Sequence, residues 1–115
     1  IRTLSALIRV MITGSAGGVG QAIFKALKLS CLELELITAD ISRANAGFHR
    51  GVKSLIIPKV ENPDSLEIIK EILQENKIDI VFIGSERELE FFSLNKEELE
   101  KETDAKILIS PIEII

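Results

Sequence analysis

Short apolar runs alternate along this chain with longer segments in which apolar residues recur at helical spacing. Five runs are predicted to be strands: Arg9–Thr13, Leu34–Ala39, Leu55–Ile57, Asp79–Gly84 and Lys106–Ser110. Between the first two runs, one apolar helical face is expected over residues 19–29, formed by Val19, Ile23, Ala26 and Leu27. Strands that alternate with helices over short loops indicate βαβ units and a parallel sheet.

Two further helices are expected. The segment Asn62-Pro63-Asp64 predicts a helix start, with Asn62 as the N-cap and Pro63 at the first helical position. In that helix one apolar stripe is expected from Leu66, Ile69 and Leu73, and a solvated face from Glu67, Lys70, Glu71 and Glu75. A very polar helix is expected over residues 95–102, capped by Asn95.

These elements predict a three-layer, Rossmann-like α/β fold with an open parallel sheet of five strands in the order 3-2-1-4-5. In such sheets ligands bind beyond the carboxyl ends of the strands, near the point where the strand order reverses. The residues expected at that edge are Gly14–Val19, Asp40–Ser42, Pro58 and Gly84–Glu86. Phe91, Phe92 and Leu94 are expected in the core or at a domain interface.

Length and composition indicate one domain. The chain has 115 residues, of which 46% are hydrophobic, and this is enough for one core. Residues 1–8 are expected to be an N-terminal extension and residues 9–115 the domain. Because the chain lacks an initiator Met and residues 111–115 end on isoleucines, we expect it to be a fragment of a longer protein.

Charge and residue types exclude several functional classes. The net charge is −4, with seven basic and three acidic residues in positions 1–53 but seven basic and fifteen acidic residues in positions 54–115. An acidic chain without Tyr or Trp makes a poor nucleic-acid binder. The longest charge-free run, Val10–Phe24, contains four glycines and does not predict a membrane span. A single Cys31 and a single His49 exclude an internal disulfide and a zinc cluster, so a cytoplasmic location is expected.

A glycine-rich loop lies between the first strand and the first helix. Its spacing is G-x-x-G-x-x-G, because Ser15 stands where a dinucleotide motif would have its first glycine, and no Lys-Ser or Lys-Thr follows as in a P-loop. The helix behind the loop offers free N–H groups and a positive dipole end to a phosphate or carboxylate. The candidate anion-binding residues are Gly14, Ser15, Ala16, Gly17, Gly18 and Val19. Alternatively, the glycines only allow the strand and helix to pack.

Acidic residues also end two of the predicted strands. Asp40 follows Gly20 by twenty residues, where a dinucleotide enzyme would bind a ribose diol, although loop solvation or a helix cap explains it equally well. Gly84, Ser85 and Glu86 point toward the same edge as candidate substrate-binding residues, whereas Glu88 and Glu90 are expected to be solvated helix residues. No catalytic residue and no metal ligand is predicted.

Taken together, these motifs resemble the N-terminal domain of carbamoyl-phosphate-synthase-like ATP-grasp proteins. The resemblance rests on the glycine loop from Arg9 onward, Thr38-Ala39-Asp40, Ile57-Pro58-Lys59, Ile78-Asp79-Ile80-Val81-Phe82 and Gly84-Ser85-Glu86-Arg87-Glu88-Leu89. It covers about nine tenths of the chain, and the combination of motifs is more specific than the loop alone.

The resemblance implies an enzyme that uses ATP to activate a carboxylate as an acyl phosphate. In that family the N-terminal domain forms one wall of the acceptor-substrate site, and residues matching Gly14–Val19 and Gly84–Glu86 contact a small anionic substrate, with a smaller part for Asp40. The ATP clamp and the Mg-binding acids belong to a downstream ATP-grasp domain. This chain alone is therefore not expected to be a ligase, and it is expected to contact that domain and to form a homodimer.

The main alternative is an NAD(P)-binding module of the extended short-chain dehydrogenase and epimerase type, which shares Thr-Gly-x-x-Gly-x-x-Gly. Those enzymes use a Tyr as general acid/base, and this chain has none, although that Tyr would normally follow residue 115. The carboxylate of Glu86 is also awkward where the nicotinamide half of a dinucleotide would pass. A third interpretation is a structural or regulatory module with no ligand.

Overall fold

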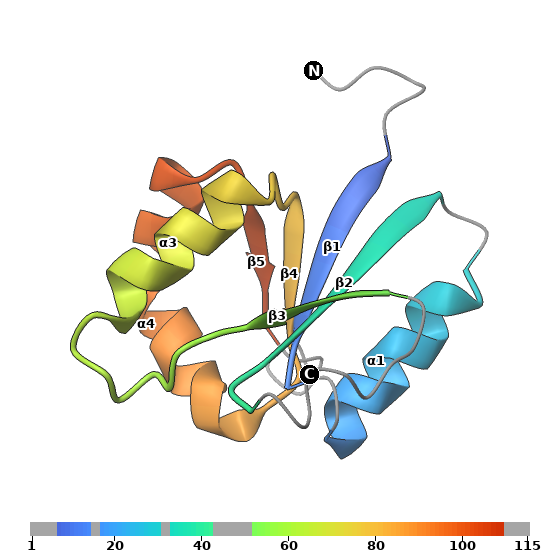
Figure 1. Cartoon of the computed structure of the whole chain (residues 1–115), viewed down its shortest axis with the longest axis horizontal. Coiled ribbons are helices and arrows are strands. Elements are labelled where there is room, and N and C mark those ends of the chain that lie inside the picture. Colours follow the sequence, from blue (N-terminus) through green and yellow to red (C-terminus); the bar gives the residue numbers. More distant parts are fainter. Residues whose placement is uncertain (1–6, 15–16, 31–32, 43–51, 110–115) are drawn as a thin grey trace.

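A single parallel sheet forms the centre of the computed structural model, which describes residues 7–14, 17–30, 33–42 and 52–109 (Figure 1). The strands are β1 (Ile8–Thr13), β2 (Leu34–Asp40), β3 (Lys53–Ile56), β4 (Ile80–Ile83) and β5 (Lys106–Leu108). Their order is β3-β2-β1-β4-β5, and every neighbouring pair is parallel. The predicted five-stranded Rossmann-like fold is confirmed.

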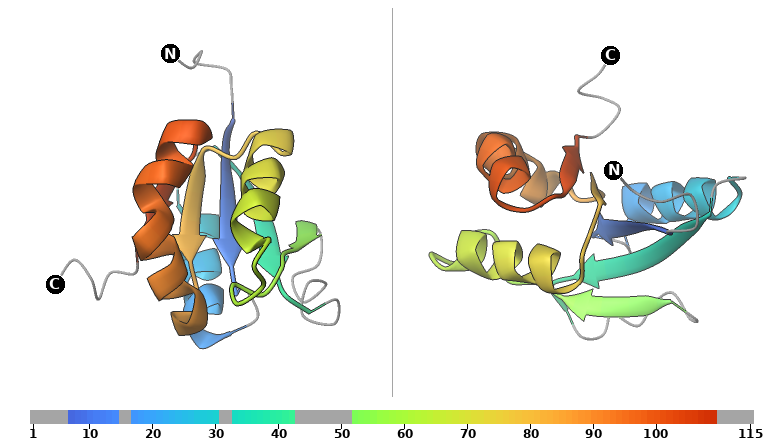
Figure 2. Two further views of the ribbon diagram at one scale, coloured as in Figure 1. Left: turned by 90° about the vertical axis from the view of Figure 1, so that its left-hand side faces the viewer. Right: turned by 90° about the horizontal axis from the view of Figure 1, so that it is seen from above.

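Helices cover both faces of this sheet. The helix α1 (Gly18–Lys28) lies on one face, and α3 (Ser65–Glu75) and α4 (Glu86–Glu102) lie on the other (Figure 2). Alternate residues of β1 point to opposite faces, so Met11 joins the core under α3 and α4 while Val10 and Ile12 pack with Phe24 of α1. The result is a three-layer arrangement with two separate cores.

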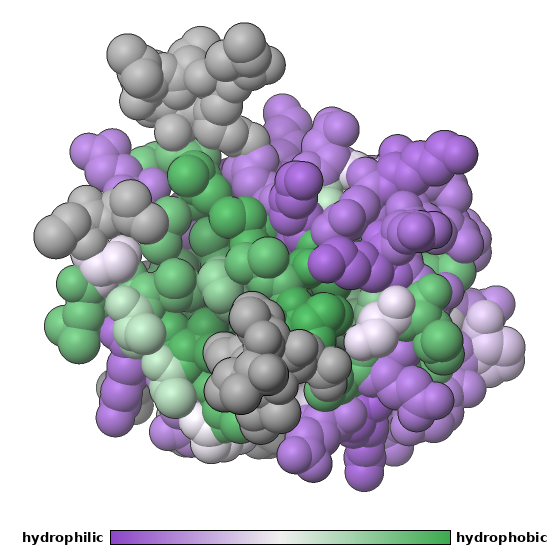
Figure 3. Space-filling view, turned by 180° about the vertical axis from the view of Figure 1, so that it is seen from behind, coloured by the Kyte–Doolittle hydropathy of each residue, from purple (hydrophilic) through white to green (hydrophobic). Residues whose placement is uncertain are grey.

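The two cores differ in how completely they are covered. The core under α3 and α4 contains thirteen buried residues, among them Phe92 and Leu99, which are fully buried. On the α1 side three buried side chains are surrounded by eight partly buried hydrophobic residues, and Leu108 of β5 is 40% exposed. Figure 3 accordingly shows apolar surface gathered on the side that carries α1 and hydrophilic surface on the side of α3 and α4.

The helix boundaries differ from the sequence prediction at two places. The polar helix begins at Glu86 rather than at Asn95, and the Asn95 amide instead donates to the Phe91 carbonyl one turn earlier. The helix α3 begins at Ser65, and the Asn62 side chain accepts from the Asp64 N–H in a turn before the helix. Asn62 and Asn95 are therefore not N-caps, because both amides bond locally within a turn or helix instead.

The residues that α1 and α4 bury also differ from the sequence prediction. In α1 the buried residues are Gly20 and Phe24, while Val19 is 46% exposed. In α4 Phe92 is fully buried and contacts Phe91 edge-on, with ring centroids 5.2 Å apart, but Leu94 is 78% exposed. Leu94 is therefore not a core residue. No helix of the described chain is long and apolar enough to cross a membrane.

Lys70 is buried, in contrast to its predicted solvated position. Its ammonium group lies between α3 and α4, where it donates to Glu98, to Glu102 at 3.2 Å and to Glu67 at 3.5 Å. Hydrogen bonding to Glu98 raises the pKa of Lys70 above its ordinary value of 10.5, against an opposing effect of burial. The ammonium therefore links the two helices across the layer that covers the sheet.

Gly84 allows β4, β1 and α1 to meet closely. A Cβ atom at Gly84 would lie 2.3 Å from the Thr13 carbonyl oxygen and 2.8 Å from Gly20 Cα, and both of these are backbone atoms. The Gly84 N–H donates to the Thr13 carbonyl at 3.1 Å. No side chain fits here, since neither neighbour can rotate away.

We expect Lys70→Met to lower the melting temperature, because Glu98 and Glu102 would face each other without their shared cation. The loss should shrink at high salt, which screens that repulsion. Because folding raises the pKa of Lys70, its contribution should be complete below about pH 10.5 and should be lost gradually as the pH rises from there through the higher pKa of the folded state. Glu67→Gln is the control, since Glu67 is 75% exposed, and thermal melts that rank Glu67→Gln as the more harmful change would contradict this assignment.

Gly84→Ala should destabilise the fold by roughly 1–3 kcal/mol or more, because its Cβ would overlap backbone atoms. Gly18→Ala is the matched control, since nothing lies within 4 Å of a Cβ at Gly18 and alanine favours a helix. Urea unfolding of both variants measures the difference. Equal stability of the two variants would show that the Gly84 contact is not required.

Candidate functional site

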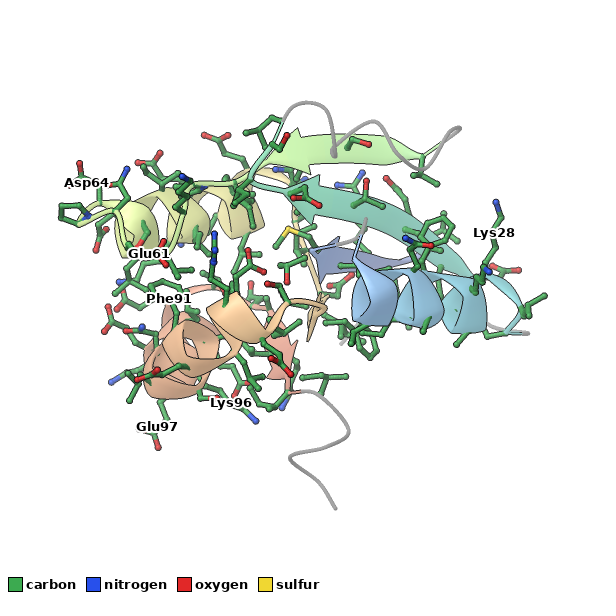
Figure 4. The ribbon with its side chains drawn as sticks, turned by 90° about the horizontal axis from the view of Figure 1, so that it is seen from below. Lys28, Glu61, Asp64, Phe91, Lys96 and Glu97 are labelled. Carbon is green, nitrogen blue, oxygen red and sulfur yellow. The ribbon has the colours of Figure 1, made fainter. Side chains whose placement is uncertain are left out.

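The carboxyl ends of β1, β2 and β4 bring three predicted segments to one edge of the sheet. Thr13 is level with Ala39 of β2 and with Ile83 of β4, so Gly14, Asp40 and Gly84 follow at neighbouring positions. Figure 4 views the molecule from this edge. The predicted grouping of these residues at the switch point is thus present in the described chain.

Gly14 makes the tight turn out of β1. Its φ is +56°, in the left-handed region that favours glycine, and a Cβ there would lie 2.8 Å from Ser85 Cβ. The Gly17 N–H then donates to the Gly14 carbonyl at 3.0 Å. Gly14 is thus a turn and packing residue against the start of α4, while Ser15 and Ala16 lie outside the described residues.

The N-terminus of α1 has the features of an anion site. Gly17 is the N-cap without a side-chain capping bond, and the first turn contains no acidic residue. The first N–H groups of a helix have no partner within the helix, and they carry the positive end of its dipole. Among the described residues, a Cβ at Gly17 would have only one contact, 3.4 Å from the Gly14 oxygen, and one at Gly18 would have none, so no described side chain fills the space at this end of the helix.

The N-terminus of α4 is different, although it lies at the same edge. Ser85 is its N-cap without a side-chain capping bond, and Glu86 and Glu88 occupy its first turn. The exposed carboxylate of Glu86 already compensates the helix dipole. The exposed Glu86 is therefore suited to a hydroxyl or amine donor of a ligand rather than to its anionic group.

At the end of β2, the Asp40 carboxylate bonds to the backbone of the next residue. It is 6% exposed, and its Oδ1 atom accepts a hydrogen bond from the Ile41 N–H at 2.9 Å. This is the contact of an aspartate that ends a strand. A ribose-binding acid must instead present its carboxylate to the ligand.

Glu88 is the residue at this edge whose role the sequence did not reveal. It is 4% exposed, although it was predicted to be solvated, while Glu90 is exposed as predicted. Burial raises the pKa of the Glu88 carboxyl above its ordinary value, and the negative charge of Asp40 raises it further. A hydrogen bond with Thr13 opposes this effect. The Ser85-x-x-Glu88 spacing is a capping-box signal, but it does not indicate burial.

A surface cavity of about 740 Å³ lies at the opposite edge, around the start of β1 and the end of α3. Its wall includes Arg9, whose guanidinium contacts Glu35 at 3.3 Å and donates to the Asn76 carbonyl at 2.8 Å. None of the predicted site residues lines it. We therefore assign the candidate site to the carboxyl edge, where the predicted residues lie.

Metal ligands are not grouped in the described part of the chain. Residues 7–14, 17–30, 33–42 and 52–109 contain no group of three His, Cys, Asp or Glu side chains that could hold a metal ion.

The fold is similar to that of several nicotinamide-dependent enzymes. A *Bacillus anthracis* dTDP-glucose 4,6-dehydratase in complex with NAD is 14% identical with a TM-score of 0.58, over 87% of this chain and 36% of that one. A monomeric L-threonine 3-dehydrogenase from a metagenome is 18% identical (TM-score 0.56; 85% and 34% covered), and yeast methylglyoxal/isovaleraldehyde reductase with NADPH is 19% identical (TM-score 0.52; 66% and 26% covered). The chain spans about a third or less of these proteins, and the likeness shows the fold alone.

The family is shown by a different comparison. No curated protein matches the chain, but the family model of the PylC-like N-terminal domain matches residues 10–108. This match covers β1 from Val10 onward and the other four strands completely, and it confirms the resemblance drawn from the motifs. The chain belongs to the PylC-like N-terminal domains, which are pre-ATP-grasp domains of the carbamoyl-phosphate-synthase-like ATP-grasp family.

Proposed function

We propose that this domain is the N-terminal, substrate-side part of an ATP-grasp ligase, and that its glycine loop binds the anionic group of a small substrate. The observation that carries the proposal is the N-terminus of α1, which has no side-chain cap, no acid in its first turn and open space at Gly18. Backbone N–H groups at such a terminus bind phosphate or carboxylate without further charges.

The chemistry proposed for the parent enzyme is the activation of a carboxylate as an acyl phosphate. ATP, with Mg²⁺, would supply the phosphoryl group, and both are expected to bind in the downstream ATP-grasp domain. In this chain the α1 terminus would hold and orient an anionic group of the substrate, while Glu86 would accept a hydrogen bond from a neighbouring hydroxyl or amine. Such positioning lowers the entropic part of the barrier to reaction.

The partly covered sheet face supports the proposal of a partner domain. Leu108 of β5 is 40% exposed, and Ile80 and Phe82 of β4 are only partly buried on the same side as α1 (Figure 3). We propose that the downstream ATP-grasp domain packs against this face and that the whole protein is cytoplasmic. The expected homodimer stays a prediction.

A dinucleotide-binding function has less support. The similar nicotinamide-dependent enzymes share the fold at 14–19% identity, which is too low to carry their ligand over to this chain. Asp40, the only acid in the ribose-binding position, is 6% exposed and bonds the adjacent backbone. The carboxylate of Glu86, at the first position of α4, would also be unfavourable where the nicotinamide half of a dinucleotide would pass.

Inorganic phosphate is expected to shift the amide resonances of Gly17–Gly20 in a ¹H–¹⁵N NMR titration. Gly18→Asp should abolish this binding, because the new carboxylate would occupy the helix terminus as an internal anion. Gly18→Asn has nearly the same shape without the charge and should retain most of the affinity. Equal phosphate affinity of the aspartate and asparagine variants would contradict binding at the α1 terminus.

NADH should not bind the chain at micromolar concentration. The chain lacks Trp and Tyr, so cofactor fluorescence can be followed with little protein emission. We expect no saturable enhancement when NADH is titrated into the wild type. Saturable enhancement that Asp40→Ala abolishes would instead support the dinucleotide interpretation.

A further inference from the structure

Glu88 joins the start of α4 to the end of β1 directly below the glycine loop. The Gly84 N–H donates to both oxygens of Thr13, to the carbonyl at 3.1 Å and to Oγ1 at 3.3 Å. Because Oγ1 already accepts there, the Thr13 hydroxyl proton is available to the Glu88 carboxyl, with which it forms a hydrogen bond. Glu88 therefore contacts the residue from which the loop leaves the sheet.

The other oxygen of this carboxyl is left without a partner. Glu88 is 4% exposed, and its Oε1 atom is buried with no hydrogen bond among the described residues. A buried carboxylate with an unpaired oxygen is costly, whereas the neutral acid loses much less on burial. The site thus favours the protonated form.

On balance, the charged groups around Glu88 also favour its protonated form. Asp40, at the end of β2, and Glu61, before α3, disfavour a second negative charge, while Arg87 on α4 itself favours it. Together with burial, these groups raise the pKa of Glu88 above its ordinary value of 4.5. Ionisation of Glu88 therefore requires a higher pH than that of an ordinary glutamate.

We propose that Glu88 is a positioning residue whose protonation is coupled to anion binding at the glycine loop: the anion is held while Glu88 is neutral and is weakened when Glu88 ionises. This inference rests on the proposed anion site at α1. Ionised Glu88 would place a negative charge next to Thr13, one residue before the loop, in a low-dielectric environment where repulsion is strong. By linkage, a bound anion must raise the pKa of Glu88 by the same coupling.

Sulfate is the probe that tests this coupling, because its own charge is constant between about pH 5 and about pH 8, unlike that of phosphate. In the wild type, the sulfate dissociation constant from the α1 amide shifts should rise roughly threefold to tenfold as the pH passes through the ionisation of Glu88, which corresponds to a coupling of up to about one pKa unit. Glu88→Gln keeps a neutral, isosteric side chain, so its affinity should match the low-pH wild type and stay constant with pH.

Two control variants locate the effect. Glu90→Gln removes an exposed carboxylate of the same helix and should keep the wild-type pH profile. Asp40→Asn should lower the midpoint of the profile without abolishing it, because the Asp40 charge acts through Glu88. A Glu88→Gln variant that binds sulfate with the wild-type pH dependence, or a profile lost in Asp40→Asn alone, would overturn the proposal.

A second measurement does not depend on any variant folding. The ¹³C carboxyl resonance of Glu88 in the wild-type chain can be titrated with pH in the presence and absence of sulfate, and sulfate should move its midpoint upward. An unchanged midpoint together with clear sulfate binding would overturn the coupling while leaving the anion site intact. No sulfate binding at any pH would overturn the proposed function, and the coupling with it.

Discussion

The close approach of β4 to β1 and α1 at Gly84 determines the arrangement of the whole carboxyl edge. With a Cβ only 2.3 Å from the Thr13 oxygen, any other residue would push β4 and the start of α1 apart. The approach lets Gly84 donate to Thr13 and sets Ser85 against Gly14, so that α1 and α4 begin at the same place. The position of the loop, the exposure of the α1 terminus and the burial of Glu88 all follow from this contact.

The two helices that begin at this edge differ in the charge of the side chains at their N-termini. The terminus of α1 carries no acidic residue, while that of α4 carries Glu86 and Glu88. Two bare positive termini side by side would repel each other, and two acidic ones would exclude an anion. In our proposal, this asymmetry leaves the α1 terminus for a ligand anion, while the exposed carboxylate of Glu86 at the α4 terminus accepts from a polar donor on the same ligand.

The sequence was sufficient for the strands, their order and the grouping of Gly14, Asp40 and Gly84, because parallel topology and short loops leave few arrangements. It was insufficient where tertiary contacts decide between local alternatives. Asn95 looked like a cap, yet its amide bonds within a continuous helix. Lys70 looked solvated, but its partners Glu98 and Glu102 are 28 and 32 residues away in the sequence. Glu88 occupies a capping-box position, and only the approach of Thr13 explains its burial.

The same physics explains why the fold resembles nicotinamide-dependent enzymes while the family is an ATP-grasp one. A glycine turn that opens a helix at the switch point of a parallel sheet binds an anion in either setting, so the loop alone does not separate them. The acidic residues around the loop do distinguish the two kinds of protein. A dinucleotide needs an exposed carboxylate after β2 and free space after β4, whereas here Asp40 is buried and Glu86 and Glu88 follow β4. The positions of Asp40 and Glu86 therefore support our proposal that this edge takes one small anion with a polar neighbour rather than a dinucleotide.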